Sequence, residues 1–458
     1  MKQASDKNQT DPAITTSKPE RRRILIWGIL CTLCFAVIFA FKPNLMQRLD
    51  YLEYDFLLAK FPNNNASSKL VIVDLDEKSL SRYGQWPWPR YRVAGLLDKV
   101  IAMQPDIISL DIVFAEPDRT SAGPLLKDLG DVYRIKIDLH GLPRSLKDND
   151  QILAQTLAGG PFVLGTIFHF DELKKGSDRC VLHPVKSSYI NDDVNQNAHT
   201  EIPVSTGVLC NLPMLSDKVS SSGFFNFSPD SDGVLRRLPM LIQYHGQLYP
   251  NLALATVLKL KNENHVILKK DRNHLQSIHY RGNAVPVDRH GQMLIKFRSS
   301  AQKYEYVSAA DILDNNVSPE RLRGRIVFVG TSAVGLKELL NTPLGPVFPG
   351  VEVHATAVDN LLKGDFISLP GWSNGFILLL VMVSGLAMSL LISYQKAATG
   401  FVAMLLFAGG LWMTTHQVFF RMGFFVATAF PIASVICNYM FLTALKYRME
   451  EKKNLAHM

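Results

Sequence analysis

The sequence predicts an α/β domain, with a mostly parallel sheet and flanking helices, joined to four transmembrane α-helices. Four long apolar stretches, one near the start of the chain and three near its end, bracket a polar region at 42–369. Within that region, short apolar runs rich in β-branched residues alternate with helical apolar periods, which is typical of α/β domains.

The first apolar stretch, 24–41, contains no charged residue. As a helix it measures about 27 Å, close to the thickness of the hydrocarbon layer of a bilayer. We therefore expect a transmembrane helix at 21–42, preceded by a disordered cytoplasmic tail at 1–20. A cleaved signal peptide is the alternative, but the apolar core is long and Ile38 and Ala40 form a poor cleavage site.

The three later apolar stretches predict transmembrane helices at 371–395, 396–416 and 422–445, leaving a domain at 43–370 and a short tail at 446–458. Basic residues precede the first span, separate the second from the third, and follow the fourth. They are Arg21, Arg22, Arg23, Lys396, Lys446, Arg448, Lys452 and Lys453. The positive-inside rule makes all three groups cytoplasmic, so the large domain is expected outside the cytoplasm and both termini inside it.

The composition fits a hybrid of membrane segments and a folded domain, with 47% hydrophobic and 20% charged residues. The net charge of +8 does not indicate nucleic-acid binding, because much of the excess lies beside the spans, where it meets anionic lipid. We expect membrane lipid as a partner, and we expect no nucleic acid, cofactor or bound metal.

Two of the five cysteines lie outside the predicted spans. An oxidising compartment permits a disulfide between Cys180 and Cys210, and the sequence leaves both the bonded and the free state open. Cys31 and Cys34 have a CxxC spacing, but inside an uncharged span this spacing indicates packing rather than redox chemistry.

The predicted domain begins with a strand, a helix and a second strand at 69–75, 90–103 and 106–114, which indicates a βαβ unit with a parallel strand pair. Later apolar runs predict further strands and helices. The strands are at 161–168 and 325–329 and the helices at 150–158, 251–261 and 351–363, with short antiparallel strands within 278–297. A partly amphipathic helix at 44–61 follows the first span. Both junctions with the spans are short, so we expect a change of shape in the domain to reach the spans.

Polar side chains follow the predicted parallel strands, where α/β domains bind ligands. The candidate ligand-binding residues are Asp74, Asp76, Asp111, Glu116, Asp118, Thr331, Ser332 and His354. A small polar ligand or a divalent cation suits such a crevice. The alternative is structural: Asp74, Asp76 and Asp111 cap helices or tie loops to strand ends through backbone amides.

Three other motifs carry weaker chemical signals. The segment 228–239 begins like a calcium loop but has Pro239 at its twelfth position, so it predicts a turn whose arginines pair with nearby carboxylates. GTSAVG resembles a nucleophile elbow with Ser332 as nucleophile and His354 as base, but Val334 stands in place of the second glycine and Glu338 is only the nearest candidate for the acid. In GQWPWPR, the tryptophans either pack on the domain or cover a ligand or a partner.

Taken together, VIVDLDEKSLSRYGQWPWPR, DIISLDIVFAEPD, GFFNFSPDSDGVLRR, RGRIVFVGTSAVGL, Thr342-Pro343 and PGVEVHATAVDNLLKG resemble a CHASE-family extracellular sensor domain of the second type. The blocks follow the family's order and cover most of 45–364. The resemblance implies one span before the domain and three after it. It also implies a homodimeric receptor in a bacterial plasma membrane, with a periplasmic or extracellular sensor domain and a cytoplasmic cyclase or kinase as output.

The tail at 446–458 is too short to form a catalytic domain, so we expect no enzyme activity in this chain. We expect a signalling enzyme to act in cis in a longer receptor or in trans as another protein, and a small molecule of unknown identity to be the stimulus. A membrane scaffold that holds partners without signalling is the alternative. The small residues Gly385, Ala387, Ser389, Gly400 and Gly409 permit close helix contacts in the membrane.

Overall fold

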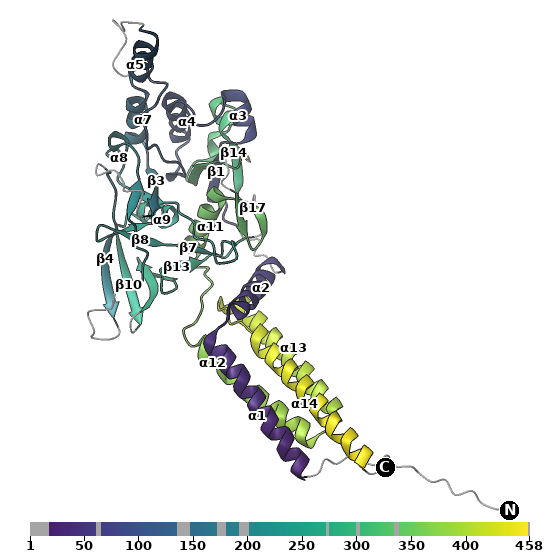
Figure 1. The fold of residues 1–458 in the computed structure, drawn as a ribbon. Coiled ribbons are helices and arrows are strands. Elements are labelled where there is room, and N and C mark those ends of the chain that lie inside the picture. The colour runs from purple at the N-terminus through teal and green to yellow at the C-terminus, as the bar shows by residue number, and fades with distance from the viewer. Residues whose placement is uncertain are drawn as a thin grey trace, which may run out of the picture. The chain divides into compact units, whose positions relative to one another are not determined.

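The computed structural model describes residues 18–60, 66–134, 147–171, 180–191, 201–271, 274–298, 303–333 and 339–456 (Figure 1). The chain divides into two compact units. The membrane unit comprises 1–57 and 369–458, and the ectodomain unit comprises 58–368. Most of the predicted disordered tail lies outside the described residues, but Lys18 to Glu20 form the first turn of a helix.

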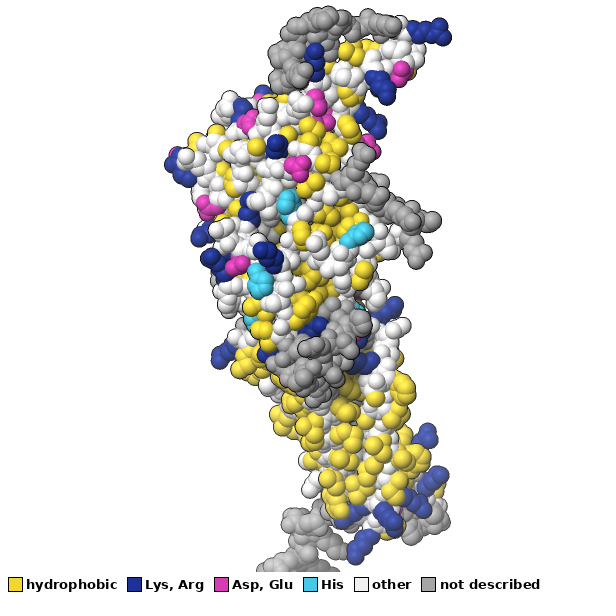
Figure 2. Space-filling view, turned by 90° about the vertical axis from the view of Figure 1, so that its left-hand side faces the viewer, with side chains coloured by type: hydrophobic (Ala, Val, Ile, Leu, Met, Phe, Trp, Pro, Cys, Tyr) yellow, Lys and Arg dark blue, Asp and Glu magenta, His cyan; other side chains and the backbone are white. Residues whose placement is uncertain are grey.

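The membrane unit contains four helices that are long and apolar enough to cross a bilayer, together with a shorter helix that follows the first of them. The four candidate spans are α1 (Lys18–Phe41), α12 (Ser373–Tyr394), α13 (Ala397–Met422) and α14 (Ala429–Ala456), and the shorter helix is α2 (Asn44–Lys60). Figure 2 shows their surface densely covered by hydrophobic side chains, with lysines and arginines gathered at one end. The turn after α13 uses Gly423, whose φ of 67° favours glycine, so α14 starts later than the 422 expected from apolarity.

Small residues bring α1, α12 and α14 close together, as the sequence predicted for Gly385 and Ser389. A Cβ atom on Gly385 would lie 2.5 Å from Thr32 Oγ1, and one on Gly28 would lie 2.2 Å from Ser389 Oγ. The amide of Asn438 on α14 donates to Thr32 Oγ1 (3.2 Å) and to the carbonyl of Gly385 (3.1 Å). This single side chain therefore links three spans by hydrogen bonds inside the membrane unit.

The ectodomain unit is built on a mostly parallel sheet with the strand order β14-β1-β15-β2-β3-β5, and β6 also pairs with β3. All pairings are parallel except that of β3 with β5. The strands are β1 (Leu70–Asp74), β2 (Ile107–Leu110), β3 (Phe162–His169), β5 (Gly207–Leu209), β6 (Ser222–Phe224), β14 (Glu305–Ser308) and β15 (Ile326–Gly330).

The predicted βαβ unit at 69–114 has parallel strands, but the prediction that they pair was wrong. β15 lies between β1 and β2 and bonds to both, with Val71 opposite Val327 and Val327 opposite Ile108. Every residue of β1, β2 and β15 is buried, as expected for strands covered on both faces.

Helices cover both faces of the sheet. On one face α4 packs against α7 and α10, and their apolar side chains share a core with alternate residues of the strands, such as Val71, Val73 and Ile108. On the other face α9 packs against α11, and both contact strands of the sheet. The helices of the ectodomain unit are α3 (Glu77–Tyr83), α4 (Arg90–Ala102), α5 (Ala122–Tyr133), α7 (Asn149–Ala158), α8 (Pro213–Ser216), α9 (Leu252–Leu260), α10 (Ala309–Leu313), η1 (Pro319–Arg321) and α11 (Gly350–Lys363).

Smaller sheets complete the ectodomain unit. A four-stranded sheet has the order β12-β11-β10-β4, and three two-stranded sheets pair β13 with β7, β16 with β17 and β8 with β9. Their bounds are β4 (Lys186–Asn191), β7 (Arg237–Pro239), β8 (Leu241–Tyr244), β9 (Gln247–Pro250), β10 (His265–Asp271), β11 (His274–Tyr280), β12 (Asn283–Pro286), β13 (Gln292–Leu294), β16 (Leu339–Thr342) and β17 (Gly345–Pro349).

Two of the weaker sequence motifs have structural roles. The segment around Gly233 is a turn, as predicted, and Arg236 donates to Asp232 through both terminal nitrogens (2.9 and 2.8 Å), while Arg237 pairs with Asp230 (2.6 Å). The carboxylates that a calcium loop would need for the metal are thus paired with guanidinium groups. Trp88 is buried in the core, and its indole N–H donates to the carbonyl of Gly84 (2.7 Å), which supports the packing interpretation of this residue.

Cys180 and Cys210 form a disulfide with Cα atoms 5.8 Å apart. Of the two states that the sequence left open, the structure therefore shows the bonded one. Both residues pack against an apolar cluster that includes Phe168, Val208 and Phe224. The bond therefore fixes the segment before β4 to the segment after β5.

Replacing both cysteines by alanine is expected to destabilise the ectodomain unit by about 3 to 4 kcal/mol, because the bond closes a loop across 30 positions and restricts the unfolded chain. Thermal unfolding of the full-length chain in detergent, with and without reductant, measures this loss. Reductant should lower the midpoint of the wild type and leave the double variant unchanged. Equal midpoints for oxidised wild type and double variant would contradict the prediction.

Candidate functional site

The carboxyl ends of β1 and β15 open into a crevice of about 470 Å³. Side chains from these two strand ends, from the start of α3 and from β14 line it. They are Asp74, Asp76, Glu77, Lys78, Tyr304, Tyr306, Ser332 and Ala333. The crevice thus contains three of the residues predicted from the sequence, namely Asp74, Asp76 and Ser332.

Asp74 and Ser332 join the two strand ends at the floor of the crevice. The backbone N–H of Ser332 donates to Asp74 Oδ1 (2.8 Å), and its hydroxyl donates to Oδ2 (2.5 Å). Burial raises the pKa of Asp74, whereas the hydrogen bonds from Ser332 act in the opposite direction and the nearby Asp76 adds to the rise. Thr331 contributes a further tie, because its hydroxyl donates to the carbonyl of Leu75 (3.1 Å).

Asp76 caps α3, as the structural interpretation predicted. Its Oδ1 accepts from the backbone N–H of Ser79 (2.8 Å), from the Ser79 hydroxyl (2.6 Å) and from the Ser308 hydroxyl (2.9 Å). The carboxylate therefore stabilises the start of α3 and fixes it to the end of β14. Asp76 also belongs to the lining of the crevice.

Five lining residues of the crevice were not predicted from the sequence, namely Glu77, Lys78, Tyr304, Tyr306 and Ala333. The hydroxyl of Tyr306 donates to Glu352 Oε2 (2.8 Å), and the backbone N–H of Lys303 donates to Glu352 Oε1 (2.9 Å). Burial raises the pKa of Tyr306, and the negative charge of Glu352 raises it further, so the phenol is neutral. The alternation of Tyr304, Glu305, Tyr306 and Val307 was the available signal for the short strand β14.

His354 and Asp111 do not line the crevice. His354 is fully buried on α11, stacks on Phe227 with ring centroids 5.0 Å apart, and has Nε2 4.0 Å from Asp111 Oδ1. Burial lowers the pKa of His354 to about 3, so the imidazole is neutral near pH 7. His354 and Asp111 therefore lie outside the lining of the crevice, because α11 packs onto the sheet, and their role in ligand binding stays a prediction.

The hydrolase interpretation lacks its essential contact within the described part of the chain. The hydroxyl of Ser332 donates to Asp74, and no hydrogen bond joins it to His354. Glu338, the nearest acidic residue in that interpretation, lies outside the described residues. The pair of Ser332 and Asp74 ties two loops together rather than activating a nucleophile.

Glu116 also lies away from the crevice, contrary to the prediction. Its side chain is 73% exposed and pairs with Arg119 (3.2 Å). The loop after β2 instead buries Asp118, which accepts from the backbone N–H of Arg90 (2.8 Å) and the amide of Asn149 (3.0 Å). Hydrogen bonds from these donors and from Thr120 outweigh burial, which raises the pKa, and hold the pKa of Asp118 below its usual range.

The crevice is rich in hydrogen-bond acceptors. It contains the carboxylates of Asp74, Asp76 and Glu77, while its one lysine, Lys78, is paired with Asp311 (2.6 Å). Such a lining suits a ligand that presents N–H or O–H groups. Among the described residues, no three His, Cys, Asp or Glu side chains are arranged to hold a metal ion.

The family model of the CHASE2 domain matches residues 30–389, which include the ectodomain unit, half of the first span and most of the second. No curated protein and no solved structure is significantly similar to the chain.

An Asp74→Asn variant tests the electrostatics of the crevice. Because the pKa of Asp74 is raised above the ordinary value of about 3.9, protonation favours the folded state. The stability that protonation contributes is present at acidic pH and is lost as the pH rises through the pKa of the folded state. The variant, which lacks this titration, should melt at or above the wild type at pH 7, and its advantage should shrink towards pH 4.

Thermal unfolding of the full-length chain at both pH values measures the effect. Asp98→Asn, which changes an exposed carboxylate on α4, is the matched control and should follow the wild type. An Asp74→Asn variant that is less stable than the wild type at pH 7 would show that the ionised carboxylate is favourable there.

Proposed function

Because the chain belongs to the CHASE2 family of extracellular sensor domains, we propose that it is a plasma-membrane sensory receptor. In this proposal the ectodomain unit lies outside the cytoplasm of a bacterial cell, both termini lie inside, and an external condition changes the ectodomain. The change passes through the spans to a cytoplasmic cyclase or kinase. A CHASE2 domain is a sensor rather than a catalytic domain, so the enzyme activity is assigned to that output.

One observation carries the relay: a carboxylate from α2 caps the fourth span. Glu53 accepts hydrogen bonds from the backbone N–H groups of Thr428 and Ala429 (both 2.8 Å) and from the Thr428 hydroxyl (2.5 Å). Glu53 is only 6% exposed. These donors belong to the start of α14, where backbone N–H groups lack helical partners and the helix dipole favours a negative charge.

The position of α2 in the chain gives this cap its importance. α2 follows the first span after Lys42 and Pro43 and runs as one helix into the first residues of the ectodomain unit. A displacement of α2 therefore acts directly on the first turn of α14, and α14 continues to the C-terminal segment.

The return connection is also fixed on the ectodomain side. Asp365, just after α11, accepts from Lys296 Nζ and Arg298 Nη1, both at 2.5 Å. The backbone of Ile367 bridges to Leu294, and α12 begins at Ser373. A connection this short absorbs little movement, so a rearrangement near α11 is passed to the start of α12.

We further propose that the receptor acts as a homodimer and that its output enzyme is joined to it in cis or recruited in trans. Gly409 and Gly410 on α13 have no heavy atom within 4 Å of where a Cβ would lie, which leaves room for a second copy or for lipid. In the strand-end crevice we place a small-molecule stimulus with hydrogen-bond donors.

A membrane scaffold without signalling is the second candidate function. In that case the cap formed by Glu53 has no role in output.

The proposed orientation predicts opposite labelling of two introduced cysteines. In a background without Cys31, Cys34 and Cys437, a cysteine at Gln243 should react with a membrane-impermeant maleimide added to intact spheroplasts. A cysteine at Tyr447 should react only after the membrane is permeabilised. The reverse pattern would place the ectodomain unit in the cytoplasm and end the receptor proposal.

The relay predicts that removal of the cap alters output. With a nucleotide cyclase fused after Met458, Glu53→Ala should change basal cyclic-nucleotide production by about fivefold or more, as expected for loss of a coupling of ordinary strength. Arg48→Gln, which changes an exposed side chain on the same helix, is the matched control and should leave production unchanged.

The amount of each variant in the membrane fraction must be equal for this comparison. The scaffold candidate predicts the same production from the wild type and Glu53→Ala. Hydrogen exchange at Thr428 and Ala429 provides an independent check, because their amides should exchange faster once the carboxylate is gone.

A further inference from the structure

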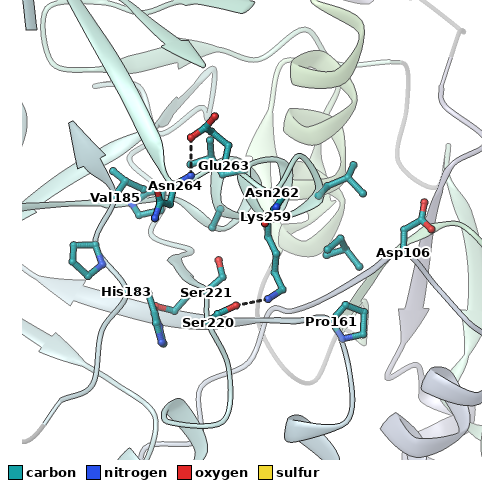
Figure 3. Close-up of a pocket in the computed structure, with 17 residues that line it drawn as sticks. Asp106, Pro161, His183, Val185, Ser220, Ser221, Lys259, Asn262, Glu263 and Asn264 are labelled. Carbon is teal, nitrogen blue, oxygen red and sulfur yellow. Dashed lines mark hydrogen bonds between the residues drawn. The ribbon is translucent and has the colours of Figure 1, made fainter. Parts of the chain in front are cut away.

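A second cavity, of about 610 Å³, lies at the amino-terminal ends of β2, β3 and β6, opposite the edge of the sheet that forms the crevice. Its volume is within the range of small-molecule sites, which is about 300 to 1,000 Å³. Asp106 and Pro161 precede β2 and β3, and most of the remaining lining comes from the end of α9 and from three loops (Figure 3). Those loops are at 183–185, 220–222 and 262–264.

Lys259 supplies a positive charge to this cavity. It lies in the last turn of α9, and its ammonium group points across the cavity to the Ser220 hydroxyl, to which it donates a hydrogen bond of 2.7 Å (Figure 3). Within the described ranges no carboxylate forms an ion pair with Lys259. Burial lowers the pKa of Lys259, so the cationic form lacks both full hydration and a counter-ion.

Neutral hydrogen-bonding groups surround this charge. His183 has Nδ1 3.0 Å from Ser222 Oγ, and Ser221 lies between Ser220 and Ser222 on the same lining segment. Burial lowers the pKa of His183 and the nearby charge of Lys259 acts in the same direction, whereas a hydrogen bond with the backbone of Val219 and the charge of Asp217 raise it. The imidazole thus already has a backbone partner, while the three hydroxyls can donate to a ligand without adding negative charge of their own.

The two carboxylates in the lining do not oppose this arrangement. Glu263 is turned towards the backbone, where Oε1 accepts from the N–H groups of Asn264 (3.0 Å) and His265 (3.2 Å), and Oε2 lies 3.8 Å from Arg281 Nε. Figure 3 shows Asp106 on the opposite side of the cavity from His183. Lys259 is thus the basic residue of the lining, and among the described residues neither lining carboxylate forms an ion pair with it.

We propose that this cavity is a second ligand site that binds a small organic anion, whose carboxylate or phosphate group is received by Lys259 and Ser220. The anion displaces the Ser220 hydroxyl from the ammonium and supplies the missing counter-ion, giving charge-assisted hydrogen bonds in place of a neutral one. The strand-end crevice, which is lined by three carboxylates, does not offer this chemistry. Binding stands independently of signalling, and only a role for the anion as stimulus rests on the proposed function.

The test uses the full-length chain in detergent, with citrate and inorganic phosphate as probes and chloride at equal ionic strength as reference. Isothermal titration calorimetry measures affinity, and the two probes distinguish a carboxylate from a phosphate ligand. We expect at least one probe to bind. Lys259→Gln should weaken that binding about tenfold or more, because a hydrogen bond to a charged group is lost. Ser220→Ala should weaken it less.

Lys261→Gln is the matched control. Lys261 follows α9 directly, is exposed, and is not part of the cavity lining, so its variant has the same change of net charge. Its affinity should equal that of the wild type. Absence of binding by both probes, or equal affinities for Lys259→Gln and Lys261→Gln, would overturn the site.

A second measurement separates this site from the relay. In the cyclase fusion, an anion that binds with the expected dependence on Lys259 but leaves cyclase output unchanged supports the site and counts against a role as stimulus. Failure of binding, combined with an altered output in Glu53→Ala, overturns the site and leaves the relay intact.

Discussion

The fold of the ectodomain unit depends on the pairing of β1 with β14 on one side and β15 on the other. Asp74, the last residue of β1, lies opposite Ser308 and Gly330, which are more than two hundred positions away in the chain. Closing such a loop costs conformational entropy, which the burial of all five β1 residues helps to offset. This pairing also creates the crevice, because it brings the loops after β1 and β15 to one edge of the sheet, where Asp74 and Ser332 join them.

Local apolar patterns predicted β1, β2, β3, β15, α4, α7 and α11, because each has a continuous apolar run or a helical stripe. These patterns did not predict the strand order, since an apolar pattern shows that a strand is buried and does not show which strand lies beside it. The strand-end rule correctly placed Asp74, Asp76 and Ser332 in the crevice. It was wrong for Glu116 because the loop after β2 turns that side chain to solvent and buries Asp118 instead.

The two cavities show how one sheet can present opposite chemistry at its two edges. At the carboxyl ends, acidic side chains serve as caps and ties, so the crevice retains a surplus of acceptors. At the amino-terminal ends, the lining comes largely from the end of α9 and from three loops, one of them a run of three serines, and Lys259 has a hydroxyl as its partner. The periodicity of apolar residues does not predict such a site, because Lys259, His183 and Ser220 are far apart in the sequence and meet only in the folded domain.

Polar interactions in the membrane unit are few within the described spans, and their positions matter more than their number. Asn438 fixes the relative heights of α1, α12 and α14, while Glu53 fixes α2 to the first turn of α14. Breaking the cap would leave the buried backbone N–H of Thr428, the partly buried N–H of Ala429 and a buried carboxylate without partners, at a cost of several times about 1.5 kcal/mol. Thermal energy is about 0.6 kcal/mol, well below this cost, so the cap is a stable link between α2 and the first turn of α14. This link within the membrane unit is the structural basis of the relay that we propose.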